Sequence, residues 1–138
     1  MCAFGGCIPF YKWGSELNNL YEFTSSQIRY IVCMYRLSQG GYGVKNIEIA
    51  NALGISKPSV HNMLKSLSEM GIVRQKYFGV AHLTDEGMVL ARNYSFCFSL
   101  LEEKLVQIIG AGIVSEKSVC AILADIPYQK IVELNCNE

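Results

Sequence analysis

The stretch ISKPSVHNMLKSLSEMGI, residues 55–72, has the pattern of an amphipathic helix with an unusual polar face. Its apolar residues recur at the spacing of one helix face: Val60, Met63, Leu64 and Leu67. Ser56 can cap the helix, and Pro58 lies in the first turn, where a missing N–H is tolerated. The remaining face carries hydroxyl, amide and lysine side chains and almost no acid, although a solvated face normally mixes Glu with Lys. That composition predicts a functional surface.

The segments on either side of this helix predict a winged helix-turn-helix. Asn46 can cap a second, short helix, and Gly54 stands where a left-handed residue ends it. After Gly71, two short runs of β-forming residues flank Gly79 and predict a hairpin. Two helices joined by a tight turn and followed by a hairpin make up this motif. We expect a mostly α fold in which the small β-hairpin is the wing.

Further helix signals lie before and after the motif. Thr24 and Gln27 match a capping box and predict a helix near 24–38. Thr84 restarts a helix that can run to Ile109, and Ser115 and Pro127 can open two more. The sequence thus predicts an N-terminal arm (1–23), a winged helix-turn-helix domain (24–83) and a helical dimerisation domain (84–138).

The second helix of a helix-turn-helix lies in the major groove of DNA, which explains an acid-poor face with short polar side chains. Asn62 can bond adenine N6 and N7 together, and the Pro58 ring can touch a thymine methyl. Arg74 and Lys76 in the hairpin would hold phosphates. The predicted DNA-binding residues are Ser56, Lys57, Pro58, Ser59, His61, Asn62, Lys65, Arg74 and Lys76. A solvated face, or a winged helix that binds protein, is the alternative.

Charge is distributed in keeping with this prediction. The 138 residues hold 12 basic and 12 acidic side chains, so the overall charge says nothing about the partner. Residues 45–82, however, hold five bases and two acids, whereas residues 83–138 hold four bases and eight acids. One end of the molecule therefore suits nucleic acid, and the other suits protein.

The predicted long helix carries a 4-3-4-3 apolar seam that can pack against a second copy of the chain. Its members are Tyr94, Phe98, Leu101, Leu105 and Ile108. A hydrophobic content of 51% also favours an oligomer. No apolar run is long enough to span a bilayer, and the six cysteines form no CxxC pair. We expect a cytoplasmic homodimer without a membrane partner.

Three segments together resemble the diphtheria-toxin-repressor family of metal-responsive bacterial regulators, most closely its manganese-responsive branch. They are IEIANALGISKPSVHNMLKSLSEMGIV, QKYFGVAHLTDEG and LLEEKLVQIIG, within residues 24–134. The resemblance implies a homodimeric transcription regulator that binds double-stranded DNA through the first turns of the recognition helix. It also implies Mn²⁺ or Fe²⁺ as the cofactor.

The metal ligands of that family are mostly absent. Arg29 stands where the family has Met or Asp, and Phe98 replaces a His, although Glu102 matches. Only weak candidate ligands remain: Glu102, Asp125, Cys97 and Cys120. We expect no Mn²⁺ or Fe²⁺ site and leave the cofactor open. The cysteines are either buried small hydrophobes or a Zn²⁺- or thiol-responsive site.

The two histidines both lie in the predicted DNA-binding half, and no carboxylate pair or nucleophile–base spacing stands out. The chain is therefore predicted not to be an enzyme. The function predicted from the sequence is sequence-specific DNA binding by a homodimeric repressor related to metal-dependent repressors. The rival predictions are a winged-helix interaction module without DNA readout, and a thiol- or Zn²⁺-responsive regulator.

Overall fold

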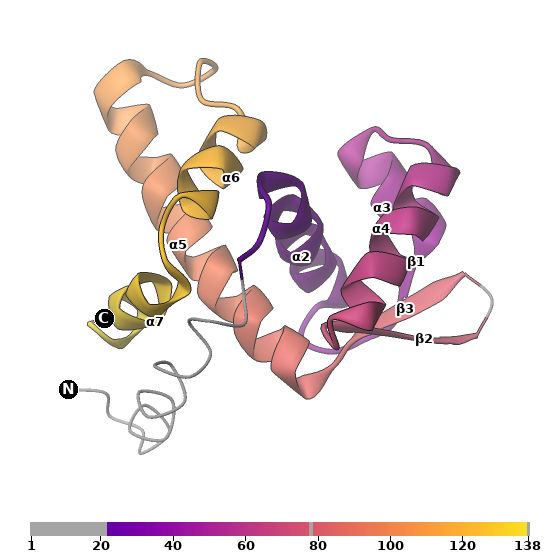
Figure 1. Cartoon of the computed structure of the whole chain (residues 1–138). Coiled ribbons are helices and arrows are strands. Elements are labelled where there is room, and N and C mark those ends of the chain that lie inside the picture. The colour runs from indigo at the N-terminus through magenta and orange to yellow at the C-terminus, as the bar shows by residue number, and fades with distance from the viewer. Residues whose placement is uncertain (1–21, 78, 138) are drawn as a thin grey trace. The chain divides into compact units, whose positions relative to one another are not determined.

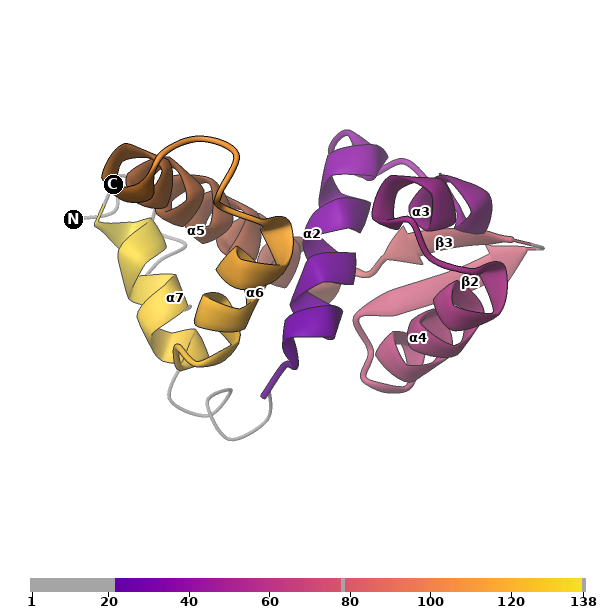
Figure 2. The ribbon, with the colours of Figure 1, turned by 90° about the horizontal axis from the view of Figure 1, so that it is seen from above.

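The computed structural model describes residues 22–77 and 79–137 and is mostly helical (Figures 1 and 2). The predicted fold class is confirmed: helices accompany a small antiparallel sheet in a winged-helix arrangement. In chain order the elements are α2 (Ser25–Ser38), β1 (Val44–Lys45), α3 (Asn46–Leu53), α4 (Lys57–Glu69), β2 (Val73–Tyr77), β3 (Val80–Leu83), α5 (Asp85–Ile109), α6 (Glu116–Ala124) and α7 (Tyr128–Cys136). The predicted arm, residues 1–23, lies outside the described residues except for Glu22 and Phe23.

The chain divides into two compact units. Residues 29–92 form the first, which we call the winged unit. The described residues 22–28 and 93–137 belong to the second, which we call the helical unit. The predicted boundaries after residues 23 and 83 differ from these divisions, which fall inside α2 and α5, and the three predicted domains remain a prediction.

In the winged unit, α3 and α4 form around the predicted turn. Gly54 has a φ of 66°, a left-handed conformation that glycine adopts without a Cβ penalty. The hydroxyl of Ser56 accepts the Ser59 backbone N–H at 3.3 Å and caps α4 as predicted. Val60, Leu64 and Leu67 are fully buried, so α4 turns its predicted apolar face inward.

The predicted wing is a hairpin with a third strand beside it. Strand β3 lies between β1 and β2 and is antiparallel to both. Gly79, with a φ of 73°, lies in the turn between β2 and β3. Both views show the β2–β3 hairpin extending beyond α3 and α4 (Figures 1 and 2). The two-residue strand β1 was not predicted, because it is too short to show an alternating pattern.

The start of α3 differs from the prediction. Asn46 is the first residue of the helix, and Lys45 occupies the capping position in an extended conformation. The Glu48 carboxylate accepts the Lys45 backbone N–H at 2.8 Å. A lysine side chain offers no acceptor that could return such a bond. Glu48, the third residue of α3, therefore supplies the capping bond, and the Asn46 side chain does not cap the helix.

The helical unit contains most of α5 together with α6 and α7. Ser115 caps α6 by accepting the Ser118 N–H at 3.1 Å, and Gly110, with a φ of 95°, follows the end of α5. The end of α5 at Ile109 and the Ser115 cap both match the sequence prediction. The ring of Tyr94 on α5 lies edge-on to Phe23 at 5.9 Å between centroids, and 5.8 Å from the ring of Tyr128 on α7.

An amide network ties α7 to α5. Asn93 donates to the Tyr128 hydroxyl at 3.0 Å. The Asn135 side-chain nitrogen donates to the Asn93 carbonyl at 3.1 Å and to the Ile131 carbonyl at 2.8 Å, and lies 3.5 Å from the Cys97 sulfur. These polar groups are used inside the unit, so they specify how the two helices pack.

The predicted dimer seam divides into a covered part and an open part. Tyr94 and Phe98 are 2% and 1% exposed in the single chain, so their side chains offer no surface to a second copy. Leu101 and Leu105 are partly exposed, and Ile108 is 77% exposed. The heptad spacing identified an apolar face, but it did not say that α7 of the same chain covers part of that face. None of the helices formed by the described residues is long and apolar enough to cross a bilayer.

Candidate nucleic-acid interface

The polar face of α4 is exposed along its N-terminal turns. Seven of the predicted contact residues lie on this helix or directly before it, and all seven are exposed. They are Ser56, Lys57, Pro58, Ser59, His61, Asn62 and Lys65. The first turn of α4 contains no acid. The positive end of the helix dipole therefore adds to the lysine charge and favours an anion at this end.

The two serines differ from the rest of this face because they bond to each other. Their hydroxyl oxygens are 2.8 Å apart, and Ser56 also accepts the Ser59 N–H. Ser56 thus caps α4, and the Ser59 hydroxyl bonds to that cap. In contrast, the side chains of Lys57, His61, Asn62 and Lys65 make no hydrogen bond or ion pair with any described residue. Asn62 consequently keeps its full donor and acceptor capacity for an outside partner.

The wing presents the other two predicted residues. Arg74 and Lys76 are exposed on β2, and neither side chain is paired within residues 22–77 and 79–137. The pairing of β2 with β3 shifts register between Gln75 and Tyr77, so the strand carries a bulge at Lys76. A bulge of this kind bends the strand and re-aims its side chains.

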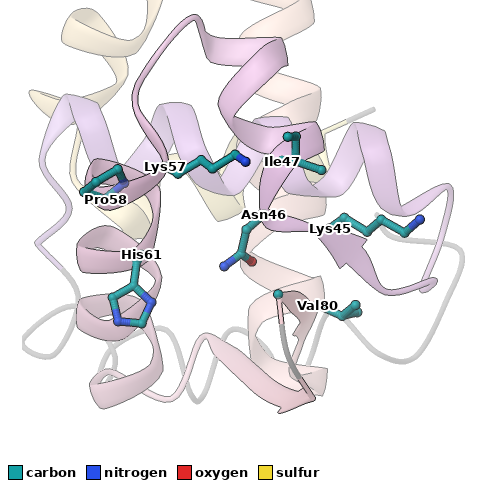
Figure 3. Close-up of a pocket in the computed structure, with 8 residues that line it drawn as sticks. Lys45, Asn46, Ile47, Lys57, Pro58, His61 and Val80 are labelled. Atoms are coloured by element: carbon teal, nitrogen blue, oxygen red, sulfur yellow. The ribbon is translucent and has the colours of Figure 1, made fainter.

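A groove of about 600 Å³ connects the recognition helix to the wing. Lys57, Pro58 and His61 of α4 line one side, and Gly79 and Val80 of the hairpin line another. Figure 3 shows Asn46 between these two walls, with Lys45 and Ile47 beside it. The described residues of the lining include two lysines and no acid, so the groove continues the basic surface of α4.

Five residues that line this groove are not among the predicted DNA-binding residues: Lys45, Asn46, Ile47, Gly79 and Val80. They meet α4 because β1 pairs with β3, with Val44 opposite Ala81 and Lys45 opposite Val80. The backbone N–H of Asn46 also donates to the Gly79 carbonyl at 2.7 Å. These contacts join residues more than 30 positions apart in the chain. The local charge of residues 45–82 was the one sequence signal that included Lys45.

Asn46 carries an unsatisfied polar atom in this groove. Its side-chain oxygen is buried and has no hydrogen-bond partner among the described residues. A buried acceptor without a donor costs free energy, about 1–3 kcal/mol for a typical group. Water or a partner molecule that donates to this oxygen would recover that cost. The groove therefore contains one acceptor, the Asn46 side-chain oxygen, that lacks a hydrogen-bond donor among the described residues.

The weak metal-ligand candidates are not brought together. Glu102 and Asp125 are exposed, whereas Cys97 and Cys120 are buried. Among the described residues no group of three His, Cys, Asp or Glu side chains could hold a metal ion. Burial raises the pKa of the Cys97 thiol to about 11, although the bond from Asn135 acts in the opposite direction. The Cys97 thiol is thus protonated at neutral pH.

Arg29 has a structural role of its own. Its Nη2 donates to the Leu53 carbonyl, at the C-terminal end of α3, at 3.1 Å. A cation is favourable at this negative end of a helix dipole. Arg29 therefore helps to hold the turn that precedes the recognition helix, at the position where the resemblance implies a metal ligand.

Comparison with known proteins supports a transcription regulator of the winged-helix type. The family model of the IclR helix-turn-helix domain matches residues 36–76, which contain α3, α4 and most of β2. This match covers less than half of the chain. No curated protein matches the sequence.

Solved structures share the fold. The metal-dependent transcriptional regulator MtsR is 19% identical with a TM-score of 0.60, over 78% of this chain and 50% of that protein. The manganese regulator SloR is 21% identical with a TM-score of 0.59, over 79% and 53%. The S. aureus MepR–DNA complex is 22% identical with a TM-score of 0.52, over 90% and 87%. The chain thus spans about half the length of MtsR and of SloR.

Proposed function

We propose that this protein is a sequence-specific DNA-binding repressor that acts as a homodimer and is not an enzyme. The observation that carries the proposal is the exposed face of α4, where Lys57, Asn62 and Lys65 have no partner among the described residues. The Asn62 amide can bond a base edge, and Lys57 and Lys65 on either side of it in the sequence can bind the phosphates that flank that base. The S. aureus MepR structure, which has the same fold, is a DNA complex.

The proposed contacts fall into two classes. Asn62 reads a base edge in the major groove, and Pro58 and His61 lie beside it in the first turns of α4. Lys57, Lys65, Arg74 and Lys76 hold phosphates, and Lys45 extends this set into the groove. Base contacts specify the operator, whereas phosphate contacts supply affinity for any DNA.

Selection from random double-stranded DNA tests the proposal. We expect enrichment of one motif with two half-sites about one DNA turn, or a small multiple of it, apart, because a two-fold dimer presents two recognition helices. Failure to enrich any motif, with binding to protein partners instead, would favour the winged-helix interaction module.

The proposed dimer uses the open end of the apolar seam. Ile108 is 77% exposed, and neighbouring Ile109 and Ile113 are 46% and 69% exposed. Exposed large apolar side chains in one region mark an interaction surface. We expect sedimentation at micromolar concentration to give twice the chain mass of 15.4 kDa, and Ile108→Glu to shift the protein toward monomer. A wild-type monomer that binds a single half-site tightly would contradict this arrangement.

We further propose that operator binding needs no Mn²⁺ or Fe²⁺, although the resemblance to the diphtheria-toxin-repressor family implies these ions. Arg29 places a cation beside the Leu53 carbonyl, and Phe98 offers no ligand atom. A metal near Arg29 would meet charge repulsion without compensating ligands. Operator affinity should survive exhaustive chelation. Loss on chelation with recovery in Mn²⁺ or Fe²⁺ would refute this, whereas recovery in Zn²⁺ alone would favour a cysteine site.

A further inference from the structure

The helical unit contains a cavity of about 500 Å³ that the proposed DNA binding does not use. The segment before α2, helix α5 and the connection between α6 and α7 contribute its walls. The residues that decide its chemistry are Glu22, Phe23, Tyr94, Asp125 and Tyr128. All of them belong to one compact unit, so the cavity is a property of that unit alone.

One side of the cavity is aromatic. The rings of Phe23 and Tyr128 each lie within 6 Å of the Tyr94 ring, centroid to centroid, and all three residues are buried. Ile126 and Pro127 add further apolar lining. Packed rings form a fixed wall because each is held by its neighbours. Such a wall favours a flat apolar group over a hydrated ion.

The other side carries negative charge without compensation. Glu22 and Asp125 are both exposed, and neither carboxylate forms an ion pair in the part of the chain that the structure describes. Among the described residues that line the cavity there is no Lys, Arg or His. The potential at the cavity is therefore negative, and an anionic ligand would be repelled.

The Tyr94 hydroxyl is a third hydrogen-bond acceptor, and it belongs to one of the three rings of the aromatic side. This side chain is 2% exposed, lines the cavity, and makes no hydrogen bond with any described residue. Burial raises the pKa of Tyr94, so the group stays a neutral phenol whose oxygen can accept a hydrogen bond.

We propose that this cavity binds a small organic cation with a flat apolar body and an ammonium or amidinium group. The apolar body would lie against the aromatic wall, and its N–H groups would donate to Glu22, Asp125 and the Tyr94 hydroxyl. A bare divalent ion fits less well, because Mg²⁺ and Ca²⁺ need several convergent oxygen ligands rather than an apolar wall. This inference does not depend on the proposed DNA binding.

Three small probes of one shape test the charge requirement. Benzamidine is cationic, benzamide is neutral and benzoate is anionic, and each is titrated into the full chain while backbone amide NMR signals are followed. We expect benzamidine to shift the signals of residues 22–24 and 124–128, and to bind about three- to tenfold more tightly than benzamide, as expected for partly exposed ion pairs. Benzoate should not bind. Equal affinity for the three probes, or shifts elsewhere in the chain, would overturn the proposal.

Matched variants assign the binding to these residues. Glu22→Gln combined with Asp125→Asn keeps the side-chain shapes and removes both charges, and should weaken benzamidine about three- to tenfold while leaving benzamide unchanged. Tyr94→Phe removes the unpartnered hydroxyl and should weaken benzamidine further without unfolding the unit. Glu102→Gln removes an exposed acid that does not line the cavity, and should have no effect. If the double variant bound benzamidine as wild type does, the site would be refuted.

Discussion

The two units use the same residue type in opposite ways. Asn62 on α4 is exposed and has no partner among the described residues, whereas Asn135 on α7 bonds two backbone carbonyls and lies against the Cys97 sulfur. A side-chain amide that forms its hydrogen bonds inside the protein stabilises packing. A side-chain amide without internal hydrogen bonds is available to bind a partner molecule. Recognition by this molecule therefore depends on the polar groups that have no hydrogen-bond partner inside the protein.

The substitution of Asn62 should change operator affinity more than any other substitution proposed below changes its measured quantity. Asn62→Ala should lower the affinity for the selected operator by about 1–3 kcal/mol, because a bidentate base contact is lost. Affinity for random DNA should barely change, and so should the free energy of unfolding, because the side chain is exposed. Both affinities are measured by fluorescence anisotropy at one salt concentration.

The matched control for that experiment is Asn51→Ala, on the neighbouring helix α3, where the asparagine is also exposed. It should leave the ratio of operator to random binding unchanged. An unchanged ratio for Asn62→Ala as well would mean that this amide does not read a base.

Asn135, whose amide is hydrogen-bonded inside the protein, should matter for stability. Asn135→Ala removes donors to the Asn93 and Ile131 carbonyls and should lower the free energy of unfolding by about 1–2 kcal/mol, measured by urea denaturation. Asn137→Ala is the control, since Asn137 lies exposed after the end of α7. Equal stability of Asn135→Ala and wild type would show that the amide network is not a stabilising feature.

The smallest expected effect comes from the thiol inside the network. Burial raises the pKa of Cys97 from an ordinary 9.0 to about 11, so the folded state holds its proton where the unfolded state has lost it. The stabilisation is present below pH 9 and is lost as the pH rises toward about 11. Relative to Cys97→Ala, wild type should lose about 1 kcal/mol of unfolding free energy by about pH 10. Parallel pH profiles for the two proteins would contradict the burial of this thiol.

Local signals predicted the helices well. Thr24 and Gln27 exchange the two predicted capping bonds, at 3.2 and 2.9 Å, and Ser56 and Ser115 cap the helices that they were predicted to cap. Each of these bonds joins residues three positions apart. Spacing within one segment is enough to recognise them.

Features made by distant segments were not predicted. The groove depends on Lys45 pairing with Val80, and the burial of Tyr94 depends on ring contacts with Phe23 and Tyr128. A heptad pattern reports that one helix face is apolar, but it does not report which segment covers that face. For this reason the seam was assigned wholly to a second copy, although Tyr94 and Phe98 are covered in the single chain.

The salt dependence of DNA binding shows directly whether the winged unit binds the DNA backbone. If the exposed face of α4 and the wing hold phosphates, the logarithm of the affinity should fall linearly with the logarithm of salt concentration, and Lys57→Gln, Lys65→Gln and Arg74→Gln should each reduce the slope by about 1 per DNA-bound copy of the chain. Lys104→Gln, an exposed lysine of the helical unit, should leave the slope unchanged. A wild-type slope near zero, or one that these three substitutions do not alter, would mean that α4 and the wing do not hold phosphates.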